Sequence, residues 1–494
     1  MQPIWVSRGS LKAYFELLHS THGPVVQFQL GSETVVSVAD PALLHTPALL
    51  RAADRPHYLF AFLEELLGKD NLQTWDGARS KSVRLLLHKC VGPAHVSQLH
   101  DRLGKITAAQ VGAWQEAATT GRRVPVQASL LPWALETAMA AILGENLPSD
   151  VDVPRFGTAY DFIMEAGIGK MQTGALSEAQ QAQLAQHQAW LQETMAALIQ
   201  QVRTAASAGS ADALDATALA GGATPAESTA DHAAAPADVN FVSLLLAATD
   251  PATGAAYDAA TIQMLVTGYI IAAYHTTVIT IAWTLYYLTQ HPDAQAAVCA
   301  ELDSVLPSNA DSGSQASAGS QAKVGSQAGS GNSGTLRKEL GPLGIPSREQ
   351  LSRLPVLTRT IQEAMRLRPA GSFAARILHE DTHVGPHLLP AGCTVLIPIL
   401  VVQRDPAHWP APDAFRPERF SEGHEHHPQA FIPFGVGPRV CPGEALAWRD
   451  MRLFLSMTLR RLSVRLAMPV AEVVPVERFV TWAANDIWLE LHPR

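Results

Sequence analysis

The chain has few cysteines and no long run of basic residues. Its four cysteines, Cys90, Cys299, Cys393 and Cys441, lie far apart in 494 residues and form no CxxC pair, which disfavours both a disulfide framework and a zinc ribbon. A net charge of −9 without a basic run argues against nucleic acid as the main partner. We therefore expect a protein of a reducing compartment that does not act on nucleic acid.

The first residues also lack a long apolar stretch. Met1-Gln-Pro-Ile-Trp-Val6 is too short for a signal peptide or a membrane anchor, and Arg8 and Lys12 follow closely. The sequence as written therefore predicts a soluble protein, or one that contacts a membrane only at its periphery.

Apolar residues make up 47% of the chain, which is enough for a large core. From about residue 41 onward they recur mainly at the three- and four-residue spacing of helices. Segments 25–30 and 34–38 read as a β-hairpin, and 394–399 and 487–491 read as short strands. We expect a mainly α-helical protein with small β-sheets, an α+β fold, in which 1–494 is one domain.

Two segments depart from the helical pattern. Residues 204–238 are rich in Ala, Ser, Thr and Gly, and residues 308–341 repeat Gly-Ser-Gln-Ala. Such compositions bury too little apolar surface to fold, so both segments are predicted to be disordered surface insertions.

The segment Met264 to Leu288 is uncharged when His275 is neutral and is long enough to span a membrane. It also contains several threonines and has no basic residues flanking it. We interpret it as the central buried helix of a large protein, because a helix that is apolar on every side is typical of that position too.

The strongest local pattern is Phe434-Gly-Val-Gly-Pro-Arg-Val-Cys441-Pro-Gly443, which a helical segment follows. Gly435 permits backbone angles closed to other residues, so the chain can turn tightly around the cysteine. Gly443 leaves room for a flat cofactor. The positive end of the following helix is predicted to lower the pKa of the Cys441 thiol and to favour the thiolate that binds metal.

This pattern resembles the haem-binding signature of the cytochrome P-450 superfamily. The resemblance implies haem b as cofactor with Cys441 as its axial metal ligand. It implies the P-450 fold, in which a long central helix lies over the haem and the cysteine loop. Phe434, Gly435 and Gly443 would shape the haem site, and Arg439 would pair with a haem propionate.

Other segments also resemble the superfamily. Glu363 and Arg366 lie three residues apart on a predicted helix, and Pro417-Glu-Arg419-Phe420 resembles the segment that supplies a second arginine to this glutamate. The three residues are predicted to form a buried charge network that supports the cysteine loop.

Two further arginines match positions that bind the haem propionates in the superfamily. They are Arg376, in Ala375-Arg-Ile, and Arg84, in Asp76-Gly-Ala-Arg-Ser80-Lys-Ser-Val-Arg84. Ser80 stands where the superfamily often has Trp or His, so one propionate hydrogen bond is expected to be missing or to come from elsewhere.

Ala272-Ala-Tyr-His275-Thr276-Thr277 resembles the oxygen-binding segment of the superfamily. Thr276 is the candidate proton donor, through water, and is expected to open the helix locally. His275 replaces the usual acid. Because histidine titrates near neutral pH, it either shuttles protons in place of that acid or is a hydrogen-bonded core histidine.

The resemblance implies a monooxygenase that uses dioxygen to oxidise an apolar small molecule of the lipid, sterol or xenobiotic class. Electrons would come from a separate donor such as an NADPH-dependent flavoprotein reductase. The alternatives are a reductase-independent haem-thiolate isomerase or dehydratase and a non-catalytic haem-binding sensor. Further segments, including 402–415 and 480–488, are similar to family 20 of the superfamily. Association with the endoplasmic reticulum membrane is implied by resemblance, and a soluble cytoplasmic protein is the alternative.

Overall fold

The computed structural model describes most of the chain, namely residues 10–52, 54–144, 151–209, 240–306, 344–423, 427–477 and 480–494. Helix α10 (Glu178–Gly209) extends into the first positions of the predicted insertion 204–238. The remainder of that insertion and all of 308–341 lie outside the described residues.

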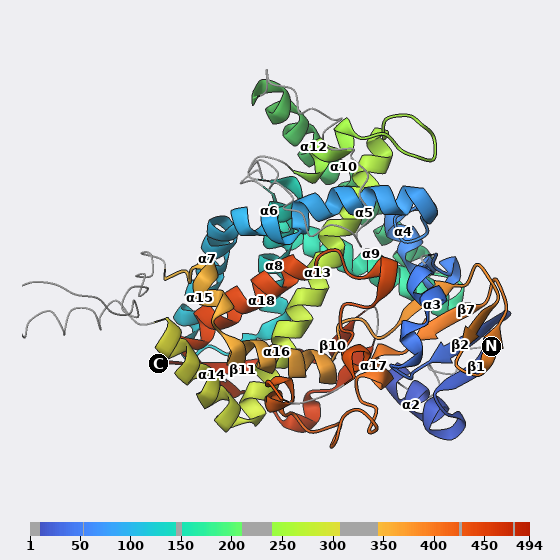
Figure 1. Cartoon of the computed structure of the whole chain (residues 1–494). Coiled ribbons are helices and arrows are strands. Elements are labelled where there is room, and N and C mark those ends of the chain that lie inside the picture. The colour runs from blue at the N-terminus through green and yellow to red at the C-terminus, as the bar shows by residue number, and fades with distance from the viewer. Residues whose placement is uncertain are drawn as a thin grey trace, which may run out of the picture.

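Helices dominate the molecule and small sheets gather at one side and one end (Figure 1). The other longer helices are α2 Leu11–His22, α5 Gly77–Val91, α7 His100–Thr119, α8 Val126–Leu143, α9 Val153–Thr173, α12 Phe241–Ala247, α13 Ala259–Gln290, α14 Pro292–Val305, α16 Pro355–Leu367 and α18 Glu444–Leu459. The shorter helices are α3 Pro47–Arg51, α4 Glu64–Leu67, α6 Pro93–Gln98, α15 Arg348–Ser352 and α17 Ile399–Val402. The prediction of a mainly helical α+β fold is confirmed.

A four-stranded sheet lies beside the N-terminal end of the described chain (Figure 1), with the strand order β1-β2-β7-β4. Its strands are β1 Val25–Leu30, β2 Glu33–Val38, β7 Thr394–Ile397 and β4 Ala374–Ile377. The hairpin β1–β2 is antiparallel, as the sequence predicts, whereas β2 pairs with β7 in parallel. The sheet thus joins the first described strands to strands from the last third of the chain.

Three smaller sheets complete the β structure. A three-stranded sheet has the order β3-β11-β8, and β9–β10 and β5–β6 are two-stranded. Their strands are β3 Val124–Pro125, β5 Thr382–Val384, β6 His387–Leu389, β8 Leu462–Leu466, β9 Pro475–Glu477, β10 Thr481–Ala483 and β11 Trp488–Pro493.

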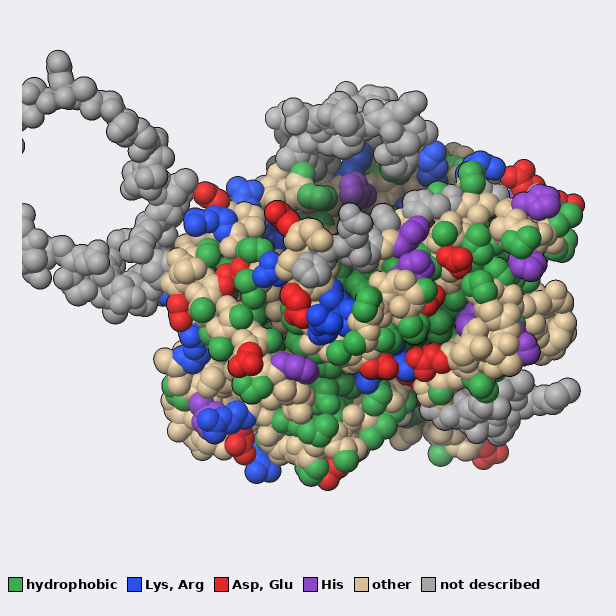
Figure 2. Space-filling model, turned by 60° about the horizontal axis from the view of Figure 1, so that its bottom comes forward, with side chains coloured by type: hydrophobic (Ala, Val, Ile, Leu, Met, Phe, Trp, Pro, Cys, Tyr) green, Lys and Arg blue, Asp and Glu red, His purple; other side chains and the backbone are tan. Residues whose placement is uncertain are grey.

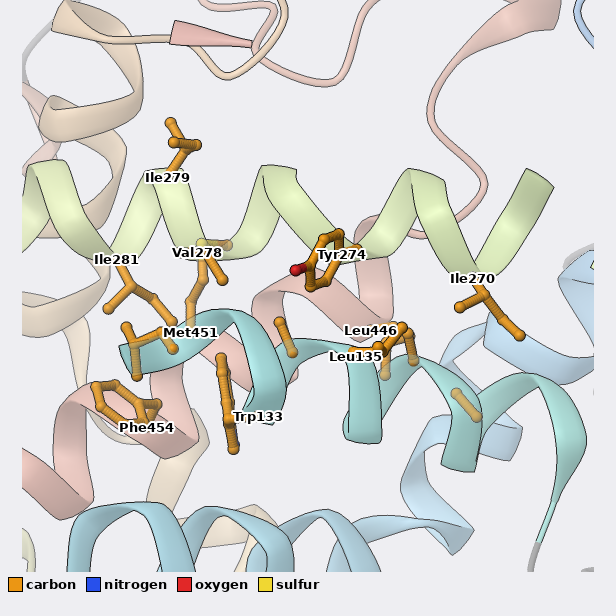
Figure 3. Close-up of a cluster of buried hydrophobic side chains, with 14 of the residues drawn as sticks. Trp133, Leu135, Ile270, Tyr274, Val278, Ile279, Ile281, Leu446, Met451 and Phe454 are labelled. Carbon is orange, nitrogen blue, oxygen red and sulfur yellow. The ribbon is translucent and has the colours of Figure 1, made fainter. Parts of the chain in front are cut away.

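Helix α13 runs through the middle of the helical body (Figure 1). Its first turn is capped by the Asp258 carboxylate, which accepts a hydrogen bond from the Thr261 amide. In Figure 3, Val278 and Ile281 point from α13 toward α8 and α18, while Ile279 points to the opposite side. Side chains on several faces of α13 are therefore buried against other parts of the protein.

Helices α8 and α13 are both long and apolar enough to cross a membrane. However, 72% of the apolar stretch of α8 and 78% of that of α13 is buried inside the molecule. This burial supports the interpretation of 264–288 as part of a core helix, because its apolar surface is already covered by protein.

Charged side chains of both signs are mixed over the face seen in Figure 2, between apolar side chains. Neither sign of charge is therefore segregated on this face.

Candidate active site around Cys441

Cys441 lies in a tight loop directly before α18. Gly435 and Gly437 have φ angles of 77° and 71°, which other residues rarely adopt. The Cys441 amide donates a hydrogen bond to the Phe434 carbonyl, with 2.9 Å between the two atoms. At Gly443, only the Cys441 Sγ lies within 4 Å of the place a side chain would take. The loop therefore has the form that the sequence predicts, with open space at Gly443.

The start of α18 acts on the Cys441 thiol in the predicted direction, but burial opposes it. Burial raises the pKa of the Cys441 thiol above its ordinary value, and this effect exceeds the opposing hydrogen bond from the Gly443 amide. The positive charges of Arg84 and Arg55 also oppose the rise in this pKa. The hydrogen bond and the two arginines thus offset only part of the rise in the thiol pKa. A bound metal ion would complete the deprotonation, because metal ligation deprotonates a thiol outright.

Glu363, Arg366 and Arg419 meet in the interior. The Arg366 guanidinium donates to both carboxylate oxygens of Glu363, at 2.7 and 2.8 Å, and the side chains of this pair are fully buried. Arg419 approaches the same carboxylate at 3.3 Å, and the Arg416 amide donates to it at 2.8 Å. A buried carboxylate with this many donors holds α16 and the segment Pro417–Phe420 together.

Four arginines gather near the cysteine loop, and three of them, Arg84, Arg376 and Arg439, are predicted by the sequence. The Arg84 guanidinium donates to the Val440 carbonyl and the Arg376 guanidinium donates to the Val436 carbonyl at 3.1 Å. Arg439 donates to the Asp76 carboxylate at 2.8 Å and to a backbone carbonyl. Backbone contacts thus tie Arg84 and Arg376 to the loop, and Arg439 joins the loop to the residues just before α5.

Arg55 is the fourth member, and sequence reasoning missed this role. Burial lowers its pKa well below the usual value, and repulsion from Arg439, Arg376 and Arg84 lowers it further. Its Nε atom is buried without a hydrogen-bond partner among the described residues. Nothing in the local sequence Asp54-Arg55-Pro56 distinguishes this arginine from one on the surface, so only the fold reveals its place.

The arginine cluster, Arg55, Arg84, Arg376 and Arg439, concentrates positive charge in the interior. Burial lowers the pKa of Arg376 to about 10, with Arg439 and Arg84 contributing to the decrease. Mutual repulsion of this kind is costly unless an anion is present. A molecule with two carboxylates would relieve it, and haem b has two propionates. The cluster and the nearby thiol therefore fit haem b.

His275 and Thr276 lie on α13. Thr276 donates its hydroxyl to the Ala272 carbonyl at 3.1 Å, and the backbone is α-helical throughout Ala259–Gln290. The predicted local opening of the helix is therefore wrong for this structure. His275 is buried, and its Nε2 forms a hydrogen bond of 2.8 Å with the carboxylate of Asp161 on α9. Asp161 is a partner that the sequence did not reveal.

Apolar side chains from other segments pack against α13 near Gly268 and His275. A side chain added at Gly268 of α13 would meet Leu72 and Leu67, and one added at Gly167 of α9 would meet the Phe62 backbone. Trp482 of β10 packs edge-on against the His275 ring, with 4.7 Å between the ring centres. These contacts surround α13 with mainly apolar and aromatic groups.

Other metal sites are not evident. Within the described parts of the chain, no three His, Cys, Asp or Glu side chains group closely enough to hold a metal ion.

Ser80, where the superfamily often has Trp or His, is buried on α5. Its hydroxyl is shorter than the side chains of Trp and His, and Arg55 is a further cation beside the cysteine loop.

Comparisons with known proteins agree with this geometry. Residues 2–319 and 336–486 match the family model described as Cytochrome P450. Cytochrome P450 3A31 of Mesocricetus auratus is 31% identical over 199 residues, which cover 40% of this chain and 33% of that protein. The human mitochondrial 25-hydroxyvitamin D-1 alpha hydroxylase is 31% identical over 230 residues, covering 46% and 39% of the two chains.

The aligned part thus spans only about a third of the length of these curated relatives. Among solved structures, the haem domain of cytochrome P450DA has a TM-score of 0.74 at 22% identity, covering 98% of this chain and 92% of that one. This likeness confirms the fold. Taken with the family model, which matches most of the chain, it shows that the protein belongs to the cytochrome P450 family, whose cofactor is a cysteine-ligated haem b.

Proposed function

We propose that this protein is a haem-dependent monooxygenase that oxidises an apolar small molecule with dioxygen. The observation that carries the proposal is the combination of the Cys441 loop with a cluster of four neighbouring arginines, Arg55, Arg84, Arg376 and Arg439. When bound, a thiolate-ligated haem supplies electron density that favours cleavage of the O–O bond. The remaining steps depend on the side chains of the protein.

The residues have distinct roles in this proposal. Cys441 is the metal ligand, and the arginine cluster holds the propionates through charge-assisted hydrogen bonds. Phe434, Gly435 and Gly443 shape the loop around the sulfur. The network of Glu363, Arg366 and Arg419 supports this part of the fold and takes no direct part in the reaction. His275 and Thr276 deliver protons from α13.

The substrate is proposed to be an apolar molecule of the lipid, sterol or xenobiotic class. Leu67, Leu72 and Trp482 contribute apolar surface next to α13, which suits such a molecule. The human relative is by its name a hydroxylase of 25-hydroxyvitamin D. A panel of lipids, sterols and drugs should contain compounds that shift the spin state of the purified haem protein, and a panel without any such compound would contradict this substrate class.

Electrons are proposed to come from a separate flavoprotein that docks beside the cysteine loop. Helix α5 reaches this loop through the contact of Arg84 with Val440, and Lys81 is exposed one turn earlier on the same helix. Exposed basic groups favour an acidic partner. Reversal of charge in Lys81→Glu should slow reduction by such a reductase without changing reduction by dithionite. Equal rates with the reductase would place the docking site elsewhere.

Peripheral association with a membrane, that of the endoplasmic reticulum, is proposed on the resemblance to the superfamily. Fractionation of cells that express the chain tests this proposal. Release of the protein in high salt is expected for peripheral contact, whereas full recovery in the cytosol would favour the soluble alternative.

The test of the central proposal is the absorption spectrum of the reduced protein with carbon monoxide. The wild-type protein should show the red-shifted Soret band of thiolate-bound haem, and Cys441→Ala should lose it. Cys393→Ala is the matched control, because this cysteine is partly buried like Cys441 but lies outside the loop, and it should retain the band. A wild-type protein without the band, or a Cys441→Ala variant that keeps it, contradicts the proposal.

Turnover separates the monooxygenase from its alternatives. Product that requires both dioxygen and an electron donor supports a monooxygenase. Product formed from a hydroperoxide without any reductant supports an isomerase or dehydratase, and ligand binding without turnover under either condition supports a sensor.

A further inference from the structure

Tyr269 of α13 is buried, but its hydroxyl is unpartnered within the described parts of the chain. The residue is only 9% exposed, and its hydroxyl forms no hydrogen bond with these parts. The Tyr160 hydroxyl also lacks a partner there, but it is completely covered by protein atoms, whereas the Tyr269 hydroxyl is not. Buried tyrosine hydroxyls normally have a hydrogen-bond partner, so an accessible one without a partner is a candidate contact for a ligand.

The Tyr269 ring is held in place by Phe241, the first residue of α12. The two rings meet edge-on, with 5.4 Å between their centres and 83° between their planes. Phe241 is completely buried, and the Asn240 side chain before it caps α12. A tightly packed neighbour of this kind restricts rotation of the Tyr269 ring, so the hydroxyl keeps its direction.

Tyr269 lies on the least covered face of α13. Between residues 265 and 285, all are buried except Ala272, Ala273 and Thr276. Residues four and seven positions apart share one face of a helix, so Tyr269 lies on the same face as Ala273 and Thr276. It stands two turns before Thr276. The hydroxyl thus belongs to the side of α13 on which the proposed reaction takes place.

Tyr269 also lies beside the arginine cluster. Burial raises the pKa of Tyr269 to about 12, and the charges of Arg84, Arg439 and Arg55 oppose this rise. The phenol therefore keeps its proton at neutral pH and can donate a hydrogen bond. Arg84 and Arg55 are also within electrostatic range of the Cys441 thiol. A neutral O–H donor thus stands beside the same cations that act on the thiol.

We propose that Tyr269 donates a hydrogen bond from its hydroxyl to one of the haem propionates. The superfamily often has Trp or His at the position of Ser80, which lies one turn before Arg84 on α5. Tyr269 would supply from α13 the donor that Ser80 does not. A phenol adds this donor without adding positive charge, which suits a cluster whose arginines already repel one another.

This inference rests on the haem b of the family and not on the proposed oxidation reaction, so either can fail alone. The first test compares Tyr269→Phe, which removes only a hydroxyl, with Tyr286→Phe as the matched control. Tyr286 lies near the C-terminal end of the same helix, against Trp283 and Tyr287.

Transfer of haem to apomyoglobin measures the rate of haem release. Release from Tyr269→Phe should be about 10- to 100-fold faster than from the wild type, because a hydrogen bond to a charged group is lost. Tyr286→Phe should release haem at the wild-type rate. The haem-free Tyr269→Phe chain should be as stable as the wild type in chemical denaturation, because the hydroxyl has no partner to lose among the described residues.

The second test examines the propionates directly. Resonance Raman spectra of haem proteins contain propionate bending bands, whose frequencies depend on hydrogen bonds to the carboxylates. One of these bands should shift in Tyr269→Phe, and none should shift in Tyr286→Phe. A shift that is common to both variants would overturn the proposal, because it would not depend on the Tyr269 hydroxyl.

An unchanged rate of haem release, or unchanged propionate bands, in Tyr269→Phe would also overturn the proposal. The same holds if the haem-free variant loses as much stability as the haem complex, because Tyr269 would then have an ordinary packing role. Each variant is first checked for the red-shifted band with carbon monoxide. A wild-type protein without this band contradicts the haem-thiolate assignment, whereas its presence leaves the role of Tyr269 to the two tests.

Discussion

The proposed chemistry falls on two regions of the molecule, and they are built differently. The cysteine loop is a continuous stretch of chain, from Phe434 to Gly443, whose shape depends on its own glycines and its own hydrogen bond. The region around His275 is assembled from α9, α13 and β10, which lie far apart in sequence. The loop can therefore retain its shape when its surroundings change, whereas the His275 region depends on how two helices pack.

The largest effect is expected from the network that supports the loop. Glu363→Gln leaves Arg366 and Arg419 buried without their counter-ion, which costs about 3–5 kcal/mol of stability. Chemical denaturation of the haem-bound protein measures this loss. Glu418→Gln, an exposed carboxylate in the same segment, is the control and should change stability by less than about 1 kcal/mol. Equal losses in the two variants would show that the loop does not depend on the network.

Helix α18, which follows the loop, contains a buried carboxyl group that should make stability depend on pH. Burial raises the pKa of Asp450 to about 7, and one of its oxygens has no partner among the described residues. Because the folded pKa exceeds the unfolded value, stability should fall as the pH rises from about 4 through 7.

Asp450→Asn should remove this dependence and stabilise the protein at pH 8, by on the order of 2–4 kcal/mol. Thermal unfolding between pH 5 and pH 8 measures the effect. A variant that loses stability equally at both pH values would mean that the carboxyl is needed in its ionised form.

A smaller effect is expected at the arginine cluster. Arg55→Met removes a charge-assisted bond to a propionate, which should weaken haem binding by about 1.5–3 kcal/mol. The haem-free chain should become no less stable, since repulsion within the cluster decreases. Transfer of haem to apomyoglobin measures the first quantity and denaturation of the apoprotein the second. If the haem-free chain loses as much stability as the haem complex, Arg55 has an ordinary packing role.

The smallest effect is expected where α9 meets α13. A methyl group at Gly157 would lie 2.5 Å from the Tyr274 hydroxyl, so Gly157→Ala must move this side chain or separate the helices. Because the contact is with the end of a side chain, a cost of about 1 kcal/mol is expected. Denaturation measures this cost, and the Soret band with carbon monoxide should not change. Gly112→Ala, on an open face of α7, is the control.

The contrast between a continuous loop and a region assembled from distant segments also explains what the sequence could predict. The cysteine loop, the pair Glu363–Arg366 and the long core helix are visible because their residues lie close together in the chain and follow known spacings. The hairpin β1–β2 is visible for the same reason. Arg55 and Asp161 could not be found in this way, because each acts through residues far away in sequence. The start of α18 lowers the pKa of Cys441 as the sequence predicts, but the larger opposing effect of burial could not be predicted, because it depends on the whole fold.

The parallel pairing of β2 with β7 has a consequence for synthesis of the protein. Val35, Val36 and Ser37 of β2 pair with Thr394, Val395 and Leu396 of β7. The β1–β2 hairpin is therefore synthesised long before the strand with which it pairs. A ribosome will have translated about four-fifths of the chain before this partner emerges. Until then the free edge of the nascent hairpin can pair with other chains, and contacts of such long range are slow to form. Productive folding should therefore depend strongly on chaperones that shield this edge during translation.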